Sequence, residues 1–311
     1  MLMGLHDQIA ALMDRFDAGD LTALDPSPTV DAVFGDLVAQ LVDPALGRDV
    51  VERACARIDH DPGWRTRAGT IRRAAAAAET AMERFHASAI ASRRGQAHEM
   101  ASAVAPFPYY DNYESLVGAE AEGITPLRGD REQRRVAFCG AGPLPLSGVL
   151  WRRLTGDDVA MLEVDADAAR LASGVVSRLV ADGLCSPVGL DVVTADAATI
   201  DARLVDVVIV ASLVPAQSVA AIANRLAVDG GQVLLAVRSA VGLTARFAYE
   251  RIDPGEIEAL GFEHLGTVAP ATAVYDGPVA PAVGVARTDP ALLSIAPAGV
   301  LNTTDLFRPR R

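Results

Sequence analysis

The chain has 311 residues, of which 50% are hydrophobic and 22% charged, so it is long enough for two domains and has the apolar content of a folded protein. Its formal net charge of −12 argues against nucleic-acid binding, because nonspecific affinity for phosphate backbones depends on clustered lysines and arginines. No apolar run approaches the ~20 residues that a membrane helix needs, and the first residues lack a signal-peptide pattern, so we expect a cytoplasmic protein without a membrane partner.

The first hundred residues have the periodicity of helices. Apolar residues recur at helical spacing within residues 5–16 and 30–41, and Ser27 followed by Pro28 is a typical start for the second run. Residues 70–94 are rich in Ala and Arg and contain no helix breaker, which predicts one long helix. We therefore predict an N-terminal helical domain over residues 1–124, and we assign no chemistry to its helices before residue 105.

Residues 105–120 (APFPYYDNYESLVGAE) contain three of the five tyrosines of the chain. The two prolines favour an extended start, after which Tyr113 and Glu120 share one face of a helix. One interpretation is a packed hinge between domains. The other is a lid over a nucleotide site that supplies phenols, the amide of Asn112 and the carboxylate of Glu120. Residues 123–133 are polar and contain glycine and proline, as expected of a linker.

A strand followed by a glycine turn opens the next part of the chain. Residues 136–139 (VAFC) are all apolar, which indicates a buried strand, and Gly140 and Gly142 then allow a sharp turn close to a ligand. The third glycine of the dinucleotide-binding fingerprint is absent, and Pro143 follows. A second strand ends at Glu163 and Asp165, about 20 residues after the glycines, where an acidic residue would hold a ribose diol.

Strands and helices alternate over the predicted domain of residues 134–290. We expect helices at 166–182, 217–226 and 254–260, and strands at 190–193, 205–211, 232–237, 262–269 and 282–286, the last two as an antiparallel pair. The pattern predicts a doubly wound parallel sheet, whose ligands bind beyond the carboxyl ends of the strands. Asp196, Ala197 and Ser212 would lie there too, Asp196 either as an acceptor for an adenine amino group or as a helix N-cap. Residues 291–311 are predicted to be a C-terminal tail.

Several of these motifs occur together in one family. The stretches FPYYDNY (107–113), GAGPLPLS (140–147), ExD (163–165) and VRSAVG (237–242), with Glu120 seven residues after Tyr113, resemble the nicotianamine synthase family. The resemblance implies an α/β fold similar to class I methyltransferases (Rossmann-like), with an N-terminal helical domain.

The resemblance also implies an enzyme that uses S-adenosylmethionine (SAM) as a co-substrate, with no metal. A nucleophile attacks the γ-carbon of the methionine part, takes the 3-amino-3-carboxypropyl group and releases 5′-methylthioadenosine (MTA). In this interpretation the glycine turn with Pro143, the acidic residues and Ser212 hold SAM, Arg238 pairs with the carboxylate of the aminoacyl arm, and Glu120 is the general base, assisted by Tyr110, Asn112 and Tyr113.

The acceptor remains open at this stage. A small-molecule amine or phenol, in metallophore or antibiotic biosynthesis, is one alternative, and intramolecular cyclisation of SAM to azetidine-2-carboxylate is another. An ordinary SAM methyltransferase and an NAD-binding protein are further alternatives. A homodimer is one possible assembly, although no stretch of the sequence marks an interface.

Overall fold

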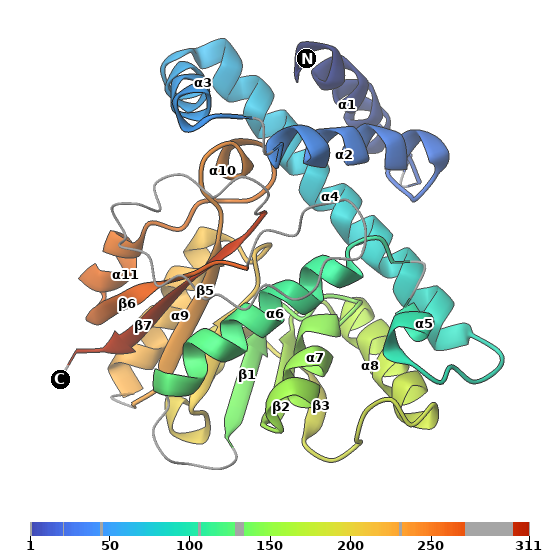
Figure 1. Cartoon of the computed structure of the whole chain (residues 1–311), viewed down its shortest axis with the longest axis vertical. Coiled ribbons are helices and arrows are strands. Elements are labelled where there is room, and N and C mark those ends of the chain that lie inside the picture. Colours follow the sequence, from blue (N-terminus) through green and yellow to red (C-terminus); the bar gives the residue numbers. More distant parts are fainter. Residues whose placement is uncertain are drawn as a thin grey trace.

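The computed structural model describes residues 2–20, 22–43, 46–104, 107–127, 134–229, 232–270 and 301–310. Four helices, α1 (Leu2–Asp17), α2 (Pro28–Leu41), α3 (Arg48–His60) and α4 (Pro62–Ser92), form a layer above a seven-stranded sheet (Figure 1). Two shorter helices, α5 (Met100–Val104) and α6 (Tyr110–Ile124), and a 3-10 turn at Thr125–Leu127 lead to the first strand. Of the described helices, none combines the length and hydrophobicity needed to cross a bilayer.

Helix α4 connects the helical layer to the sheet. The Asp61 side chain caps its N-terminus by accepting hydrogen bonds from the backbone N–H groups of Gly63 and Trp64, and an alanine-rich sequence continues it for 31 residues. The first half packs with α1 and α3, and the second half lies beside α8 of the sheet domain (Figure 1). A buried cluster that includes Ile71 and Phe247 joins the helical layer to the loop after β5. The predicted helix at 70–94 is confirmed and begins eight residues earlier.

The sheet has the strand order β3-β2-β1-β4-β5-β7-β6. Its strands are β1 (Arg135–Cys139), β2 (Asp158–Glu163), β3 (Leu190–Thr194), β4 (Val207–Val210), β5 (Leu234–Ser239), β6 (Phe262–Val268) and β7 (Thr303–Pro309). The first five are parallel, and β7 runs antiparallel between β5 and β6. The predicted doubly wound sheet is therefore confirmed, with its carboxyl ends at the side that faces the helical layer (Figure 1).

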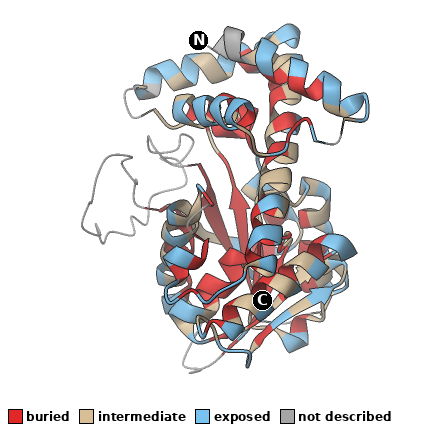
Figure 2. Cartoon of the chain, turned by 90° about the vertical axis from the view of Figure 1, so that its right-hand side faces the viewer, coloured by how far each residue is buried: buried red, intermediate tan, exposed pale blue. Residues whose placement is uncertain are grey.

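Helices cover both faces of the sheet. Helices α6, α7 (Leu146–Thr155) and α8 (Ala166–Ala181) pack on one face, and α9 (Ala216–Asp229) and α11 (Pro254–Ala259) pack on the other. A short helix, α10 (Thr244–Phe247), follows β5. Side chains alternate between the two cores, Phe138 with the first group and Cys139 with the second, as the period of a strand requires. The buried residues accordingly follow the central strands (Figure 2).

Two parts of the predicted domain organisation differ from the structure. Residues 303–309, which fall in the predicted tail, form β7 inside the sheet, where it pairs with β5 and β6. The predicted strand at 282–286 lies outside the described residues. Residues 110–120 of the predicted lid segment (105–120) belong to α6, which packs on α7 and buries Val117 in the core of the sheet domain. Helix α6 is thus part of the sheet domain, because its apolar face packs against α7 and the core of that domain.

Candidate active site

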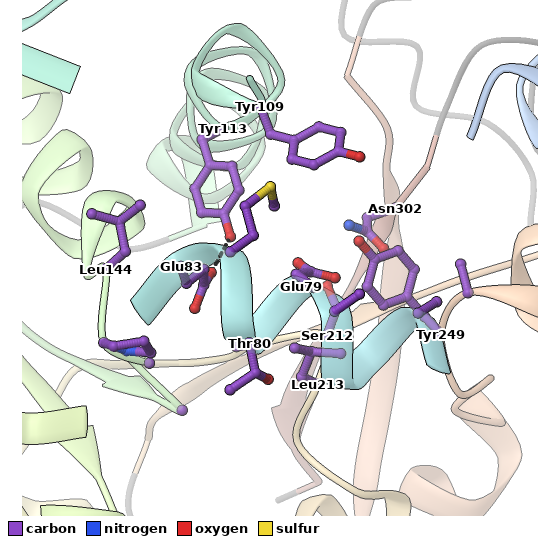
Figure 3. Close-up of a pocket in the computed structure, with 18 of the residues that line it drawn as sticks. Glu79, Thr80, Glu83, Tyr109, Tyr113, Leu144, Ser212, Leu213, Tyr249 and Asn302 are labelled. Carbon is purple, nitrogen blue, oxygen red and sulfur yellow. Dashed lines mark hydrogen bonds between the residues drawn. The ribbon is translucent and has the colours of Figure 1, made fainter. Parts of the chain in front are cut away.

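A cavity of about 1650 Å³ lies between the helical layer and the carboxyl ends of the strands. Its walls come from α2, α4, the start of α6, the glycine turn after β1 and the loops after β2, β4 and β5 (Figure 3). Eleven of the thirteen predicted site residues line it: Asn112, Tyr113, Gly140, Gly142, Pro143, Glu163, Asp165, Asp196, Ala197, Ser212 and Arg238. Tyr110 and Glu120 do not.

The glycine turn requires glycine at both positions. Gly140 and Gly142 have φ angles of +78° and +65°, which L side chains rarely adopt. A Cβ on Gly140 would lie 2.5 Å from a methyl of Val214, and one on Gly142 would lie 2.7 Å from Oε2 of Glu83. Helix α4 and the loop after β4 therefore lie too close to the turn for a side chain at either position. The backbone of the turn lines the cavity.

The acidic residues at the ends of β2 and β3 accept hydrogen bonds from the backbone of the adjoining loops. Glu163 accepts hydrogen bonds from the backbone N–H groups of Gly142 (2.8 Å) and Asp165 (2.9 Å), which joins the glycine turn to the end of β2. Asp165 caps α8 and forms an ion pair with Arg84 of α4. Asp196 accepts from the N–H of Ala198, so the predicted N-cap is confirmed, and it also lines the cavity.

Glu120 does not face the cavity. It is fully buried on α6, where its two carboxylate oxygens accept hydrogen bonds from Nε (2.8 Å) and Nη2 (2.9 Å) of Arg238, and Oε1 also accepts from the hydroxyl of Thr304 (2.7 Å). Arg238 donates its third bond to Ser147 and stacks 4.9 Å from the ring centre of Phe138. The prediction that Glu120 is the general base does not fit this geometry, because the carboxylate has no open path to a substrate. Arg238 was predicted to pair with the carboxylate of SAM, but its guanidinium forms a bidentate pair with Glu120 instead.

Two carboxylates that the sequence interpretation omitted project into the cavity from α4. Glu83 accepts a hydrogen bond from the hydroxyl of Tyr113 (2.7 Å), and Glu79 lies one helical turn before it (Figure 3). Burial and the neighbouring charge of Glu79 raise the pKa of Glu83 to about 8, and the hydrogen bond from Tyr113 opposes this rise. Burial raises the pKa of Glu79 to about 7, opposed by hydrogen bonding with Tyr249 and by the charge of Arg238. The only sequence signal was a pair of glutamates four residues apart, which is typical of a solvated helix face.

The tyrosines differ in position. Burial and the charges of Glu83 and Glu79 raise the pKa of Tyr113 well above its ordinary value, so its hydroxyl stays protonated and serves as a donor. The hydroxyl of Tyr110 is 3.4 Å from Oε1 of Glu114, and neither of these residues lines the cavity. The predicted catalytic role of Tyr110 therefore does not fit its position.

Comparison with known proteins decides the family. The model of the nicotianamine synthase protein family matches residues 3–283. The chain belongs to the nicotianamine synthase family. Nicotianamine synthase 1 of Oryza sativa subsp. indica is 30% identical over 274 residues, covering 85% of this chain and 79% of that protein. Nicotianamine synthase 1 of Hordeum vulgare is 31% identical over 296 residues, with coverages of 91% and 83%.

Solved structures show the same fold. MtNAS in complex with MTA and tNA superposes with a TM-score of 0.69 at 21% identity, and a glutamate-to-glutamine mutant of MtNAS in complex with S-adenosylmethionine with a TM-score of 0.68, each covering 98% of both chains. Family membership confirms the predicted enzyme class, a SAM-dependent aminocarboxypropyltransferase. Among the residues that the structure describes, no group of three or more His, Cys, Asp or Glu side chains is arranged to hold a metal ion.

Proposed function

We propose that this enzyme transfers the 3-amino-3-carboxypropyl group of SAM to a nitrogen or phenolic oxygen of a small-molecule acceptor and releases MTA. One observation carries the proposal: Glu83, a carboxylate with a pKa near 8, lies against the glycine turn with the hydroxyl of Tyr113 bonded to it. A base with a pKa near the working pH is suited to take a proton from a nucleophile during attack.

SAM would occupy the side of the cavity formed by the strand ends. The Cβ-free backbone of Gly140 and Gly142 allows close approach of the ligand. Glu163 already accepts two backbone N–H bonds, but each of its oxygens keeps a lone pair that can accept from a ribose hydroxyl. Asp196 and Ala197, beyond β3, would adjoin the adenine, and Ser212, after β4, would face the methionine part.

The transfer forms one bond to carbon and breaks one. The lone pair of the acceptor forms a bond to the γ-carbon as the bond from that carbon to sulfur breaks, and the sulfur keeps the electron pair to become the neutral thioether of MTA. The acceptor atom gains a positive charge and loses it by giving a proton to the Glu83 carboxylate. Tyr113 donates to that carboxylate and fixes its orientation. In-line placement of the nucleophile, more than activation, selects this carbon over the methyl group.

Product analysis tests the proposal. The purified protein is incubated with SAM, with and without candidate acceptors, and the nucleosides are separated by chromatography. MTA formation supports aminocarboxypropyl transfer, whereas S-adenosylhomocysteine would show methyl transfer and overturn it. MTA together with azetidine-2-carboxylate, in the absence of an acceptor, would instead establish cyclisation. Neighbouring genes would distinguish the biosynthetic pathway: a gene for a metal exporter indicates a metallophore, and a gene for a peptide synthetase indicates an antibiotic.

A further inference from the structure

The carboxylate of Asp165 already holds several donors of the chain itself. Oδ1 accepts hydrogen bonds from the backbone N–H groups of Asp167 (2.8 Å) and Ala168 (3.3 Å). Oδ2 forms an ion pair with Nη2 of Arg84. The two N–H groups and the guanidinium hold the pKa of Asp165 below its usual range, so the carboxylate stays charged and keeps Arg84 in place. Glu163, with one hydrogen bond to each oxygen, keeps more capacity for a ribose.

Arg84 has donors to spare. A guanidinium carries five N–H groups, and within the described part of the chain that of Arg84 makes one hydrogen bond, to Asp165. Arg84 lines the cavity, and 37% of its side chain is exposed. The other arginine of the described lining, Arg238, has only 5% of its side chain exposed and makes three hydrogen bonds, to Glu120 and Ser147. Of these two arginines, Arg84 is therefore the one that can donate to a ligand.

Consecutive residues of α4 lie against two neighbouring points of the strand ends. A Cβ on Gly142 would lie 2.7 Å from Oε2 of Glu83, and the next residue, Arg84, pairs with Asp165 just after β2. Glu163 connects these two points, since it accepts hydrogen bonds from the N–H groups of both Gly142 and Asp165. Helix α4, which begins in the helical layer, therefore lies over the glycine turn and the end of β2 together (Figure 1).

A ribose hydroxyl needs two kinds of partner. Its O–H donates one hydrogen bond, and its oxygen accepts others. In the proposed placement of SAM the O–H points to the Glu163 carboxylate, so the oxygen needs a donor from another side. Arg84, held by Asp165 two residues further along the chain, presents charged N–H groups at this end of β2. Hydrogen bonds from a charged donor are stronger than those between neutral groups, which suits a residue that holds a ligand.

We propose that Arg84 is a SAM-binding residue that donates hydrogen bonds to the ribose hydroxyl oxygens, with its guanidinium oriented by Asp165. The inference rests on the proposed placement of the ribose at Glu163, but not on the identity of the acceptor. It gives the helical layer a direct part in holding the co-substrate, because Glu163 of the sheet domain accepts from the ribose and Arg84 of α4 donates to it. SAM and MTA share the ribose, so the affinity of both depends on Arg84.

A pair of nucleosides tests the ribose contact. MTA and its 2′,3′-dideoxy analogue differ only in the two hydroxyl groups, and calorimetry measures the dissociation constant of each. The parent should bind MTA about 100-fold or more tightly than the analogue, since both hydroxyls bond to charged groups. Arg84→Met should weaken MTA about tenfold or more and the analogue less than about threefold. Arg84→Lys, which keeps the charge but loses the planar fork, should recover part of the MTA affinity.

The variant should fold, because the side chains of this ion pair are 37% and 47% exposed and such pairs contribute little to stability. Thermal unfolding followed by circular dichroism checks this. Arg170→Met is the matched control. It makes the same replacement and removes an ion pair with Asp167 on α8, but neither residue lines the cavity, so it should bind both nucleosides as the parent does.

Equal weakening of MTA and the analogue in Arg84→Met would indicate a general disturbance of the site and overturn the proposal, as would unchanged MTA affinity. Glu163→Gln separates the inference from the placement on which it rests. If Glu163→Gln loses the preference for MTA and Arg84→Met keeps it, the ribose lies at Glu163 but Arg84 does not bind it. If both variants keep the preference, the ribose placement fails and the inference fails with it. Absence of MTA formation from SAM would overturn the proposed function alone, because the nucleoside preference is measured without turnover.

Discussion

The buried ion pair between Glu120 and Arg238 gives the sharpest test of how the site is built. Replacing Glu120 with Gln leaves the guanidinium in an almost fully buried position (6% exposed for Arg238) without its counter-charge. Removing one partner of such a pair costs about 3–5 kcal/mol, because the remaining charge stays desolvated. Thr304→Val removes only one hydrogen bond to the same carboxylate, and hydrogen bonds to charged groups contribute about 1.5–3 kcal/mol. We therefore expect Glu120→Gln to be the more damaging of the two.

Urea unfolding without ligand at pH 7, followed by circular dichroism, measures these losses as shifts in midpoint. The double variant Glu120→Leu/Arg238→Met is the control, and it should recover most of the stability because no unpaired charge remains. The reasoning is refuted if Glu120→Gln unfolds within 1 kcal/mol of the parent and loses its rate of MTA release at saturating SAM. That combination would identify Glu120 as a base that the substrate reaches.

Three further predictions concern the cavity. Glu83→Gln should lower kcat by about 10²–10⁴-fold in the MTA assay with SAM affinity unchanged, and Tyr113→Phe should lower it less, because the carboxylate remains; an undiminished kcat in Glu83→Gln would exclude it as the base. The free energy of unfolding should fall as pH rises from about 5 to about 8. The folded chain keeps protons on Glu79 and Glu83 (pKa about 7 and about 8), whereas the unfolded chain releases them near the ordinary glutamate pKa of 4.5. In urea titrations at several pH values, the Glu79→Gln/Glu83→Gln variant should lose this pH dependence of stability. Gly142→Ala and Gly156→Ala both place Ala at positive φ and should each cost about 1 kcal/mol, but only Gly142→Ala brings a Cβ 2.7 Å from Glu83 and should abolish SAM binding in calorimetry; equal SAM affinity in the two variants would contradict this.

The strand and glycine-turn pattern made most of the sheet predictable. Fully buried parallel strands are continuous apolar runs, and β1, β4 and β5 have that composition. The acidic residues at the ends of β2 and β3 and the glycines can be grouped from the sequence alone, because the carboxyl ends of parallel strands meet at one edge. All of them line the cavity.

Strand β7 could not be predicted in the same way. Thr303, Thr304 and Asp305 are polar yet buried, and two of these side chains have partners on other elements: Thr304 donates to Glu120 of α6, and Asp305 contacts His264 of β6. A run of polar residues near the end of a sequence indicates a tail unless those partners are known. Its position between β5 and β6 depends on antiparallel pairings with residues 36 to 72 positions earlier, which a local pattern does not contain.

The chemistry on α4 was missed for a related reason. Glutamates four residues apart in an alanine-rich helix also occur on exposed helix faces, where the repulsion between two solvated like charges is small. Glu79 and Glu83 differ from exposed glutamates in having neighbouring side chains from other elements: Tyr113 of α6, Tyr249 after α10 and Asn302 before β7. Conversely Glu120, which the motif made conspicuous, is neutralised by Arg238 from β5. The role of each carboxylate is thus decided by side chains distant in sequence. Arg238 holds the Glu120 carboxylate in a buried ion pair away from the cavity, whereas Glu79 and Glu83 face tyrosine hydroxyls at the cavity and can take a proton.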